Sequence, residues 1–185
     1  TIPDSVTNIG DEAFYSCDNL TSVTIPDSVT SMGDKVFYSC YSLTSIMIGD
    51  GITSIGESTF GDCDSLTSVT IPNSVTSIGG SAFYSCDSLT SVTIPYSVIN
   101  LGDYAFFYCS SLTNVTIGDG VTSIDNYAFN SCKSLTSVTI PDSVTSIGDW
   151  VFNGCDSLTI ECPSGSYAEQ YAIENGIPYM VRKSF

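Results

Sequence analysis

The chain has 185 residues, of which 42% are hydrophobic, and a formal net charge of −16 with four basic residues and no histidine. This charge has the wrong sign for nucleic-acid backbones and anionic lipid surfaces, so we expect neither as a partner. No run approaches the roughly 18–20 apolar residues that a membrane-spanning helix needs, so we expect no membrane insertion of this segment.

One pattern of 23 residues recurs along most of the chain. Its clearest marks are three columns of identical residues, which are Cys17, Cys40, Cys63, Cys86, Cys109, Cys132 and Cys155; Phe14, Phe37, Phe60, Phe83, Phe106, Phe129 and Phe152; and Leu20, Leu43, Leu66, Leu89, Leu112, Leu135 and Leu158. A fixed period of about 20–50 residues is typical of solenoids, whose stacked units share one core. The sequence predicts seven rungs over residues 1–161 and a C-terminal cap over 162–185. Because Thr1 falls inside a repeat, we expect a fragment or mature segment of a longer protein.

The first half of each unit predicts two strands joined by a turn. In residues 69–71 (Val-Thr-Ile), alternation places Val and Ile in the core and Thr outside. Pro-Asp-Ser or Gly-Asp-Gly then forms a turn. The pair Val75 and Ile78 predicts a short second strand, and Gly79 predicts a corner with positive φ. The sixth unit has Asp125 at that corner, another residue type that tolerates the left-handed conformation.

The second half of each unit contains Ala-Phe-x-x-Cys, as in Ala82, Phe83 and Cys86. The i, i+3 spacing predicts one turn of 3₁₀ or short α helix. Stacked units place the cysteines in a column with parallel side chains at about the 4.8 Å strand spacing, whereas a disulfide needs convergent Cβ atoms about 3.8 Å apart. We therefore expect free, buried thiols.

The last 24 residues predict a cap. The repeat loses one residue after Leu158, which places Cys162 at an inward position. Residues 166–169 form a capping box that begins a helix ending near Asn175, with Gly176 at the C′ position. We expect Ala168, Tyr171 and Ala172 to face the last rung.

After the helix we expect an extended closing segment over residues 177–181. Arg182 and Lys183 are then expected to lead into a tail.

The repeat L-x-x-V-x-I-P-x-S-V-x-x-I-G-x-x-A-F-x-x-C, clearest in residues 66–86, resembles the BspA-type leucine-rich repeat. Residues 165–172 (Gly-Ser-Tyr-Ala-Glu-Gln-Tyr-Ala) also resemble the C-terminal cap of many such bacterial proteins. The resemblance implies an α/β, β-rich leucine-rich-repeat solenoid with parallel short strands. It also implies secreted or surface-attached proteins of host-associated bacteria and some protists, some of which resemble adhesins for host matrix proteins. No residue-level binding motif accompanies it.

The sequence contains few of the residues and motifs that catalysis requires. There is no histidine, no phosphate-binding loop and no serine or metal hydrolase motif, and the cysteines lack the electropositive, exposed setting of a nucleophile. We expect no enzyme, no catalytic residue and no cofactor.

Carboxylates recur in three columns. They are Asp4, Asp27, Asp50, Asp119 and Asp142; Asp11, Asp34, Glu57, Asp103 and Asp149; and Asp18, Asp64, Asp87 and Asp156. One interpretation is calcium held between rungs. The alternative is turn chemistry, with each Asp capping its own loop or helical turn. Because Asn73, Tyr96 and Gly80 interrupt the columns, we favour turn chemistry and predict no metal site.

The outward strand positions predict a flat hydroxyl face. Its members are Ser22, Ser45, Ser68, Ser91, Asn114, Ser137, Thr24, Thr70, Thr93, Thr116 and Thr139. One interpretation is ice binding, because regular Thr ladders can order water. The interpretation that we favour is a solvated sheet face with favourable Thr–Thr pairs.

Aromatic residues break the consensus at two variable positions beside the buried Phe. Tyr104, Tyr127 and Trp150 occupy the first, where earlier units have Glu12, Lys35, Ser58 and Ser81; Tyr15, Tyr38, Tyr84 and Phe107 occupy the second. Tyr and Trp are common interface anchors, although packing between rungs would also explain the row. The candidate ligand-binding residues are Tyr104, Tyr127, Trp150, Tyr84 and Phe107.

Two functions follow from these observations. The first is a non-enzymatic, adhesin-like module of a cell-surface or secreted protein that binds a host extracellular or matrix protein or a glycan. The second is a structural spacer with no ligand of its own.

Overall fold

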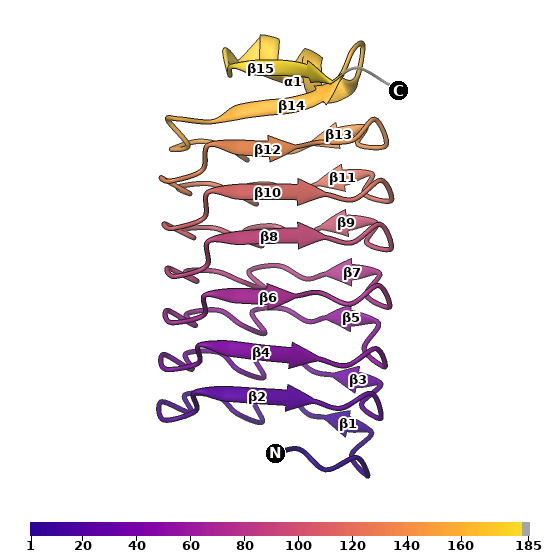
Figure 1. Cartoon of the computed structure of the whole chain (residues 1–185), viewed down its shortest axis with the longest axis vertical. Coiled ribbons are helices and arrows are strands. Elements are labelled where there is room, and N and C mark those ends of the chain that lie inside the picture. Colours follow the sequence, from indigo (N-terminus) through magenta and orange to yellow (C-terminus); the bar gives the residue numbers. More distant parts are fainter. Residues whose placement is uncertain (183–185) are drawn as a thin grey trace.

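The computed structural model describes residues 1–182 as a stack of parallel rungs, with the N-terminus at one end and a helical cap at the other (Figure 1). One face carries the longer strands β2 (Ser22–Ile25), β4 (Ser45–Ile48), β6 (Ser68–Thr70), β8 (Ser91–Ile94), β10 (Asn114–Ile117), β12 (Ser137–Thr139) and β14 (Thr159–Pro163). A second face carries the two-residue strands β1 (Asn8–Ile9), β3 (Ser31–Met32), β5 (Ser54–Ile55), β7 (Ser77–Ile78), β9 (Asn100–Leu101), β11 (Ser123–Ile124) and β13 (Ser146–Ile147).

Neighbouring rungs pair in parallel with a register of one unit. Val115 of β10 lies opposite Val92 of β8 and Val138 of β12. The long strands form the ladders β2-β4-β6 and β8-β10-β12-β14-β15, and the short strands form β1-β3 and β5-β7-β9-β11-β13. Between β6 and β8 the Thr90 N–H donates to the Thr67 carbonyl oxygen at 3.4 Å. The predicted solenoid of parallel short strands is confirmed.

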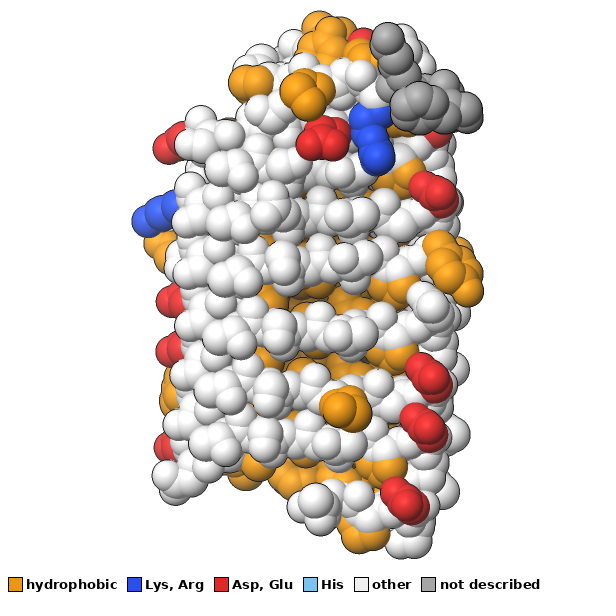
Figure 2. Space-filling model, in the orientation of Figure 1, with side chains coloured by type: hydrophobic (Ala, Val, Ile, Leu, Met, Phe, Trp, Pro, Cys, Tyr) orange, Lys and Arg blue, Asp and Glu red, His pale blue; other side chains and the backbone are white. Residues whose placement is uncertain are grey.

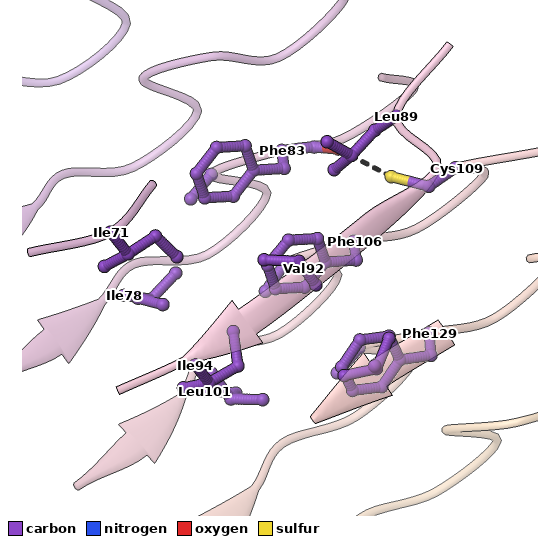
Figure 3. Close-up of a cluster of buried hydrophobic side chains, with 14 of the residues drawn as sticks. Ile71, Ile78, Phe83, Leu89, Val92, Ile94, Leu101, Phe106, Cys109 and Phe129 are labelled. Atoms are coloured by element: carbon purple, nitrogen blue, oxygen red, sulfur yellow. Dashed lines mark hydrogen bonds between the residues drawn. The ribbon is translucent and has the colours of Figure 1, made fainter. Parts of the chain in front are cut away.

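The core is a column of repeated side chains. The phenylalanines of all seven units stack almost face to face, with ring centroids 5.0–5.8 Å apart from Phe14 to Phe152. Figure 3 shows three of these rings, Phe83, Phe106 and Phe129, with Ile94 and Leu101 nearby. Offset aromatic pairs of this kind add about 0.5–1.5 kcal/mol each beyond the burial of their area.

The cysteines line the same core. All eight are free; seven are buried and Cys17 is half-buried. From Cys40 to Cys155, each thiol donates a hydrogen bond of 3.1–3.2 Å to the carbonyl oxygen of a Phe in the preceding unit. The predicted burial is confirmed for these six and for Cys162, which is fully buried in β14.

The Ala-Phe-x-x-Cys segments differ from the predicted helical turn. Bonds of the i, i+3 type do form, as from the Tyr84 N–H to the Ser81 carbonyl oxygen. However, Ser81 and Ser85 are left-handed, with φ of 55° and 54°, so no helix propagates. Instead, the N–H groups of Ser81, Phe83 and Ser85 donate to the next unit at 2.7–2.8 Å. These segments, called turn segments below, therefore form a third hydrogen-bonded wall.

The corner glycines also have a different role from the predicted one. Gly79 is not left-handed, and neither is Asp125. A Cβ on Gly79 would lie 2.9 Å from the backbone nitrogen of Glu57 and the carbonyl carbon of Gly56. Because real Cβ atoms essentially never come that close, the approach of the preceding rung favours glycine there, although the sixth unit accommodates the Cβ of Asp125.

The cap consists of α1 (Tyr167–Asn175) and β15 (Tyr179–Arg182). Ser166 caps the helix by accepting from the Glu169 N–H, and Gly176 ends it at φ 66°. Ala168 and Ala172 are buried as predicted, and Tyr171 packs edge-on against Phe152 with ring centroids 6.2 Å apart. Residues 179–181 of the expected closing segment are strand.

Arg182 belongs to β15 and not to a tail, because it pairs with Pro163 of β14. Lys183 lies outside the described residues. Among residues 1–182, no helix is long and apolar enough to cross a bilayer.

Candidate functional site

Several carboxylates of the columns connect neighbouring rungs through hydrogen bonds. Asp34 Oδ1 accepts from the Glu57 N–H at 2.7 Å, and the Asp34 N–H donates to Asp11 Oδ1 at 2.9 Å. Asp27 and Asp103 accept in the same way from residues 23 positions later. Each of these side chains therefore caps the next unit and not its own turn, which corrects the predicted local capping. Within residues 1–182, no group of three or more acidic, Cys or His side chains could hold a metal ion.

Away from the cap, the long-strand face is mainly uncharged and polar over its centre, with acidic side chains along both edges, and next to the cap it carries an acidic and a basic side chain (Figure 2). Its outward Ser, Thr and Asn side chains are exposed or half-buried, as the alternation predicts. Met47 replaces the threonine of β4 and is 65% exposed. A shallow hollow of about 1000 Å³ lies over β6 to β14, with Tyr96 and Asp119 on its border.

A dense aromatic cluster lies on the turn segments of the fourth to sixth units. Tyr104 stacks on Tyr127 at 4.8 Å with an interplanar angle of 2°, and Tyr84 stacks on Phe107 at 5.4 Å. Tyr104 also meets Phe107 edge-on at 5.4 Å, which joins the two pairs. Tyr108, 42% exposed, lies 5.5 Å from Phe107. We call these five residues the aromatic cluster.

The backbone of the aromatic cluster is unusual. Tyr104, Tyr108 and Tyr127 have φ of 59°, 65° and 58°, in the left-handed region that bulky residues rarely adopt. Ser58 and Ser81 fill the same repeat position as Tyr104, with φ of 51° and 55°. The fold therefore accepts a small residue at this position, and the ring is not needed to make the turn.

Trp150 is separate from the cluster, although it occupies the repeat position of Tyr104 and Tyr127. Within residues 1–182, no aromatic ring stacks on its indole, which is 59% exposed. Trp150 instead borders a hollow of about 500 Å³ between the last turn segment and the C-terminal half of α1. We call this hollow the cap groove; Asp149, Asn153, Asp156, Tyr171 and Asn175 also line it.

The buried thiols are not suited to nucleophilic chemistry. Burial raises the pKa of Cys40 to about 11 and the pKa of Cys155 to about 12. Deeper burial raises the pKa of Cys86 and Cys109 as well. These four buried cysteines are therefore protonated at neutral pH, whereas a reactive cysteine needs an accessible thiolate.

A family model for the BspA type leucine rich repeat region matches residues 1–113 and 100–176 in six copies. The chain belongs to this family. Such repeat proteins are generally non-enzymatic, and the match indicates a binding or structural repeat module. A comparison with curated proteins found no significant match.

Solved structures of bacterial leucine-rich repeat proteins share the fold. A leucine rich cell surface protein from Faecalibacterium prausnitzii is 42% identical with a TM-score of 0.76, over 85% of this chain. This chain spans only 43% of that protein's length. A leucine rich repeat protein from T. pallidum is 30% identical with a TM-score of 0.79, over 97% of this chain and 81% of its own. The pneumococcal vaccine antigen PcpA is 20% identical with a TM-score of 0.75, over 96% of this chain and 45% of its own, which is a likeness of fold alone.

The structure therefore divides the five sequence-derived candidates into two places. Tyr84, Tyr104, Phe107 and Tyr127 come together in the aromatic cluster, whereas Trp150 borders the cap groove. Sequence reasoning missed Tyr108, whose repeat position otherwise contains mainly serine; its departure from that consensus was an available signal. The groove residues of α1 had no such signal, because they lie outside the repeat.

Proposed function

We propose that this chain is a non-enzymatic, adhesin-like binding module of a cell-surface or secreted protein. The aromatic cluster is its contact surface, and its partner is an extracellular protein or a glycan of the host. The similarity to a cell surface protein of F. prausnitzii supports this location.

The main support is the replacement of serine by tyrosine at a left-handed position. An L-residue in the left-handed conformation costs about 1–2 kcal/mol. The serines of the third and fourth units adopt this conformation with a small side chain, so the turn does not need an aromatic ring. Tyr104 nevertheless keeps 38% of its surface exposed. Exposed aromatic surface that the fold does not require is typical of interfaces.

The ring geometry defines how a partner would be contacted. Tyr104 and Tyr127 cover each other's inner faces at 4.8 Å, so their edges and hydroxyl groups remain for a ligand. Lys133 Nζ lies 5.6 Å from the ring of Tyr108 and adds a donor at the border of the cluster. Edges, hydroxyls and one cation suit a partner rich in carbonyl or hydroxyl acceptors, which protein loops and glycans both provide.

The proposal is tested by surface plasmon resonance at physiological salt against a panel of host matrix proteins and glycans. The variant Tyr104→Ser/Tyr127→Ser copies the third and fourth units, so it is expected to fold. The matched control, Glu12→Ser/Lys35→Ser, changes the same repeat position in the first two units without altering net charge.

We expect saturable binding by the wild type and the control, and a loss of at least about tenfold in affinity for the tyrosine variant. Binding that survives in the tyrosine variant would contradict the proposed surface. An absence of saturable binding across the panel would favour the spacer function instead.

A further inference from the structure

The cap groove differs from the aromatic cluster in the chemical character of its lining residues. It lies where the last turn segment meets the C-terminal half of α1, and its volume of about 500 Å³ is within the usual range for ligand pockets. Trp150 on one side is 59% exposed at φ 57°, and Tyr171 on the other is half-buried against Phe152. The chain has only one tryptophan, and this groove contains it.

The charge of the groove is negative. Asp149 and Asp156 line it, both are exposed, and none of its lining residues within residues 1–182 is basic. Glu174 adds a further negative charge in the last turn of α1. That turn has no basic residue to offset the negative end of the helix dipole. Burial raises the pKa of Tyr171, and the nearby charges of Tyr167 and Asp149 contribute to the rise.

Asp149 differs from Asp11, Asp34 and Asp103 in its column. In the first, second, fifth and sixth units the side chain at this position accepts a bond from the next rung, as Asp103 Oδ1 and Asn126 Oδ1 do from N–H groups at 2.9 and 2.8 Å. After Asp149 the helix cap takes the place of the next rung. The carboxylate of Asp149 therefore has no hydrogen-bond partner among the described residues. The end of the solenoid thus leaves a carboxylate beside an exposed indole.

We propose that the cap groove binds an arginine side chain of a basic segment of the protein partner. This inference rests on the proposed binding function and adds a second contact with a defined chemistry. A guanidinium group can stack on the indole of Trp150 and donate to the carboxylates of Asp149 and Asp156, whereas an anionic group would be repelled. The net charge of −16 would also accelerate the approach of a basic partner at low ionic strength.

The test uses the fluorescence of Trp150, which reports the groove alone. The 185-residue chain is titrated with a blocked tetrapeptide, acetyl-Gly-Arg-Arg-Gly-amide, and with the same peptide containing uncharged citrulline. We expect a saturable emission change with arginine that weakens at high salt, and an affinity at least about tenfold lower with citrulline.

The variants are measured by the anisotropy of a labelled arginine peptide. Asp149→Asn/Asp156→Asn is expected to weaken binding at least about fivefold, and Trp150→Ser to a similar extent. The control Asp50→Asn/Asp119→Asn removes two charges from the Gly-Asp-Gly turns and is expected to stay within about twofold of the wild type.

Equal affinity for arginine and citrulline peptides, or equal losses in both double variants, would overturn the inference. So would a saturable emission change with a neutral oligosaccharide and none with arginine. Loss of matrix-protein binding in the Tyr104→Ser/Tyr127→Ser variant is a separate result, because those residues lie outside the groove. If only the arginine site were wrong, that loss of binding would still be observed.

Discussion

The thiol of Cys109 donates a hydrogen bond of 3.1 Å to the carbonyl oxygen of Phe83, one unit earlier in the stack (Figure 3). Phe83 in turn stacks on Phe106 with ring centroids 5.0 Å apart. Both Cys109 and Phe83 are fully buried. The cysteine column is therefore a set of connections between rungs, and not only apolar filling.

We predict that Cys109→Ala lowers the free energy of unfolding by about 1–2 kcal/mol, because it removes this bond and leaves a small cavity. Cys109→Val fills the site with a slightly larger apolar side chain that has no donor, and it should cost about 0.5–1 kcal/mol. Urea denaturation followed by circular dichroism measures both. A valine variant as stable as the wild type would show that the thiol hydrogen bond contributes nothing.

Thiol reactivity should separate Cys17 from the other cysteines. Cys17 is half-buried, whereas burial raises the pKa of Cys40 to about 11. Treatment of the native protein with iodoacetamide at pH 8 should therefore modify Cys17 first and leave the buried thiols intact for hours, until urea exposes them. Peptide mass spectrometry measures the order; equal early labelling of Cys86 and Cys109 would contradict it.

The carboxylate of Asp34 should stabilise the fold as an acceptor and not through its charge. Asp34→Ala removes the 2.7 Å bond from the Glu57 N–H and should cost about 0.5–1.5 kcal/mol. Asp34→Asn should be neutral or slightly stabilising, because Asn126 makes the same bond to the Asp149 N–H at 2.8 Å and one negative charge is removed from the column. Thermal unfolding of the two variants decides; equal losses would refute the acceptor role.

The 23-residue period makes much of this fold predictable, because a side chain in a stacked repeat has the same environment in every unit. The inward Val and Ile, the Phe column, the buried cysteines and the capping box all followed from spacing and residue type. The two-residue strands followed from Val-x-x-Ile, since both residues must reach the core.

Contacts between rungs were harder to predict. A glycine favoured by the approach of another chain segment, such as Gly79, has the same sequence signature as one required by positive φ. Left-handed Ser81 and Tyr104 carry no signature, because the next rung's hydrogen bonds hold their conformation. The cap groove forms where non-repeated residues meet the last unit, so the period contains no information about it.

The close approach at Gly79 gives a prediction with an adjacent control. A Cβ at Gly79 would lie 2.9 Å from backbone atoms of the preceding rung, so Gly79→Ala should cost about 1–3 kcal/mol through forced separation of the rungs. At Gly80 the nearest atom is the Asp103 carbonyl oxygen at 3.4 Å, and other units have Asp, Glu or Asn there. Gly80→Ala should be neutral or stabilising by up to about 1 kcal/mol. Denaturant titration measures both, and similar effects would contradict the steric argument.

Mild acid should stabilise this protein. Burial raises the pKa of Asp64 and of Asp125, and the neighbouring charges of Asp87 and Asp103, respectively, add to the rise. A carboxyl whose pKa is higher in the folded state than in the unfolded state binds more protons when folded, so stability increases as pH falls from 7 through the folded pKa. The gain is complete below the unfolded value of about 3.9.

We expect the Tm in low salt to rise by about 2–4 °C between pH 7 and pH 5. The variant Asp64→Ser/Asp125→Gly installs the residue types that Ser110 and Gly102 provide at the same repeat positions, so it should be more stable at pH 7 and show a smaller rise. Asp142→Asn is the control for the loss of a single charge and should keep most of the pH dependence. Differential scanning calorimetry at both pH values measures all three proteins. A Tm that falls on acidification, or an unchanged slope in the double variant, would show that these two carboxyl groups do not control the pH dependence.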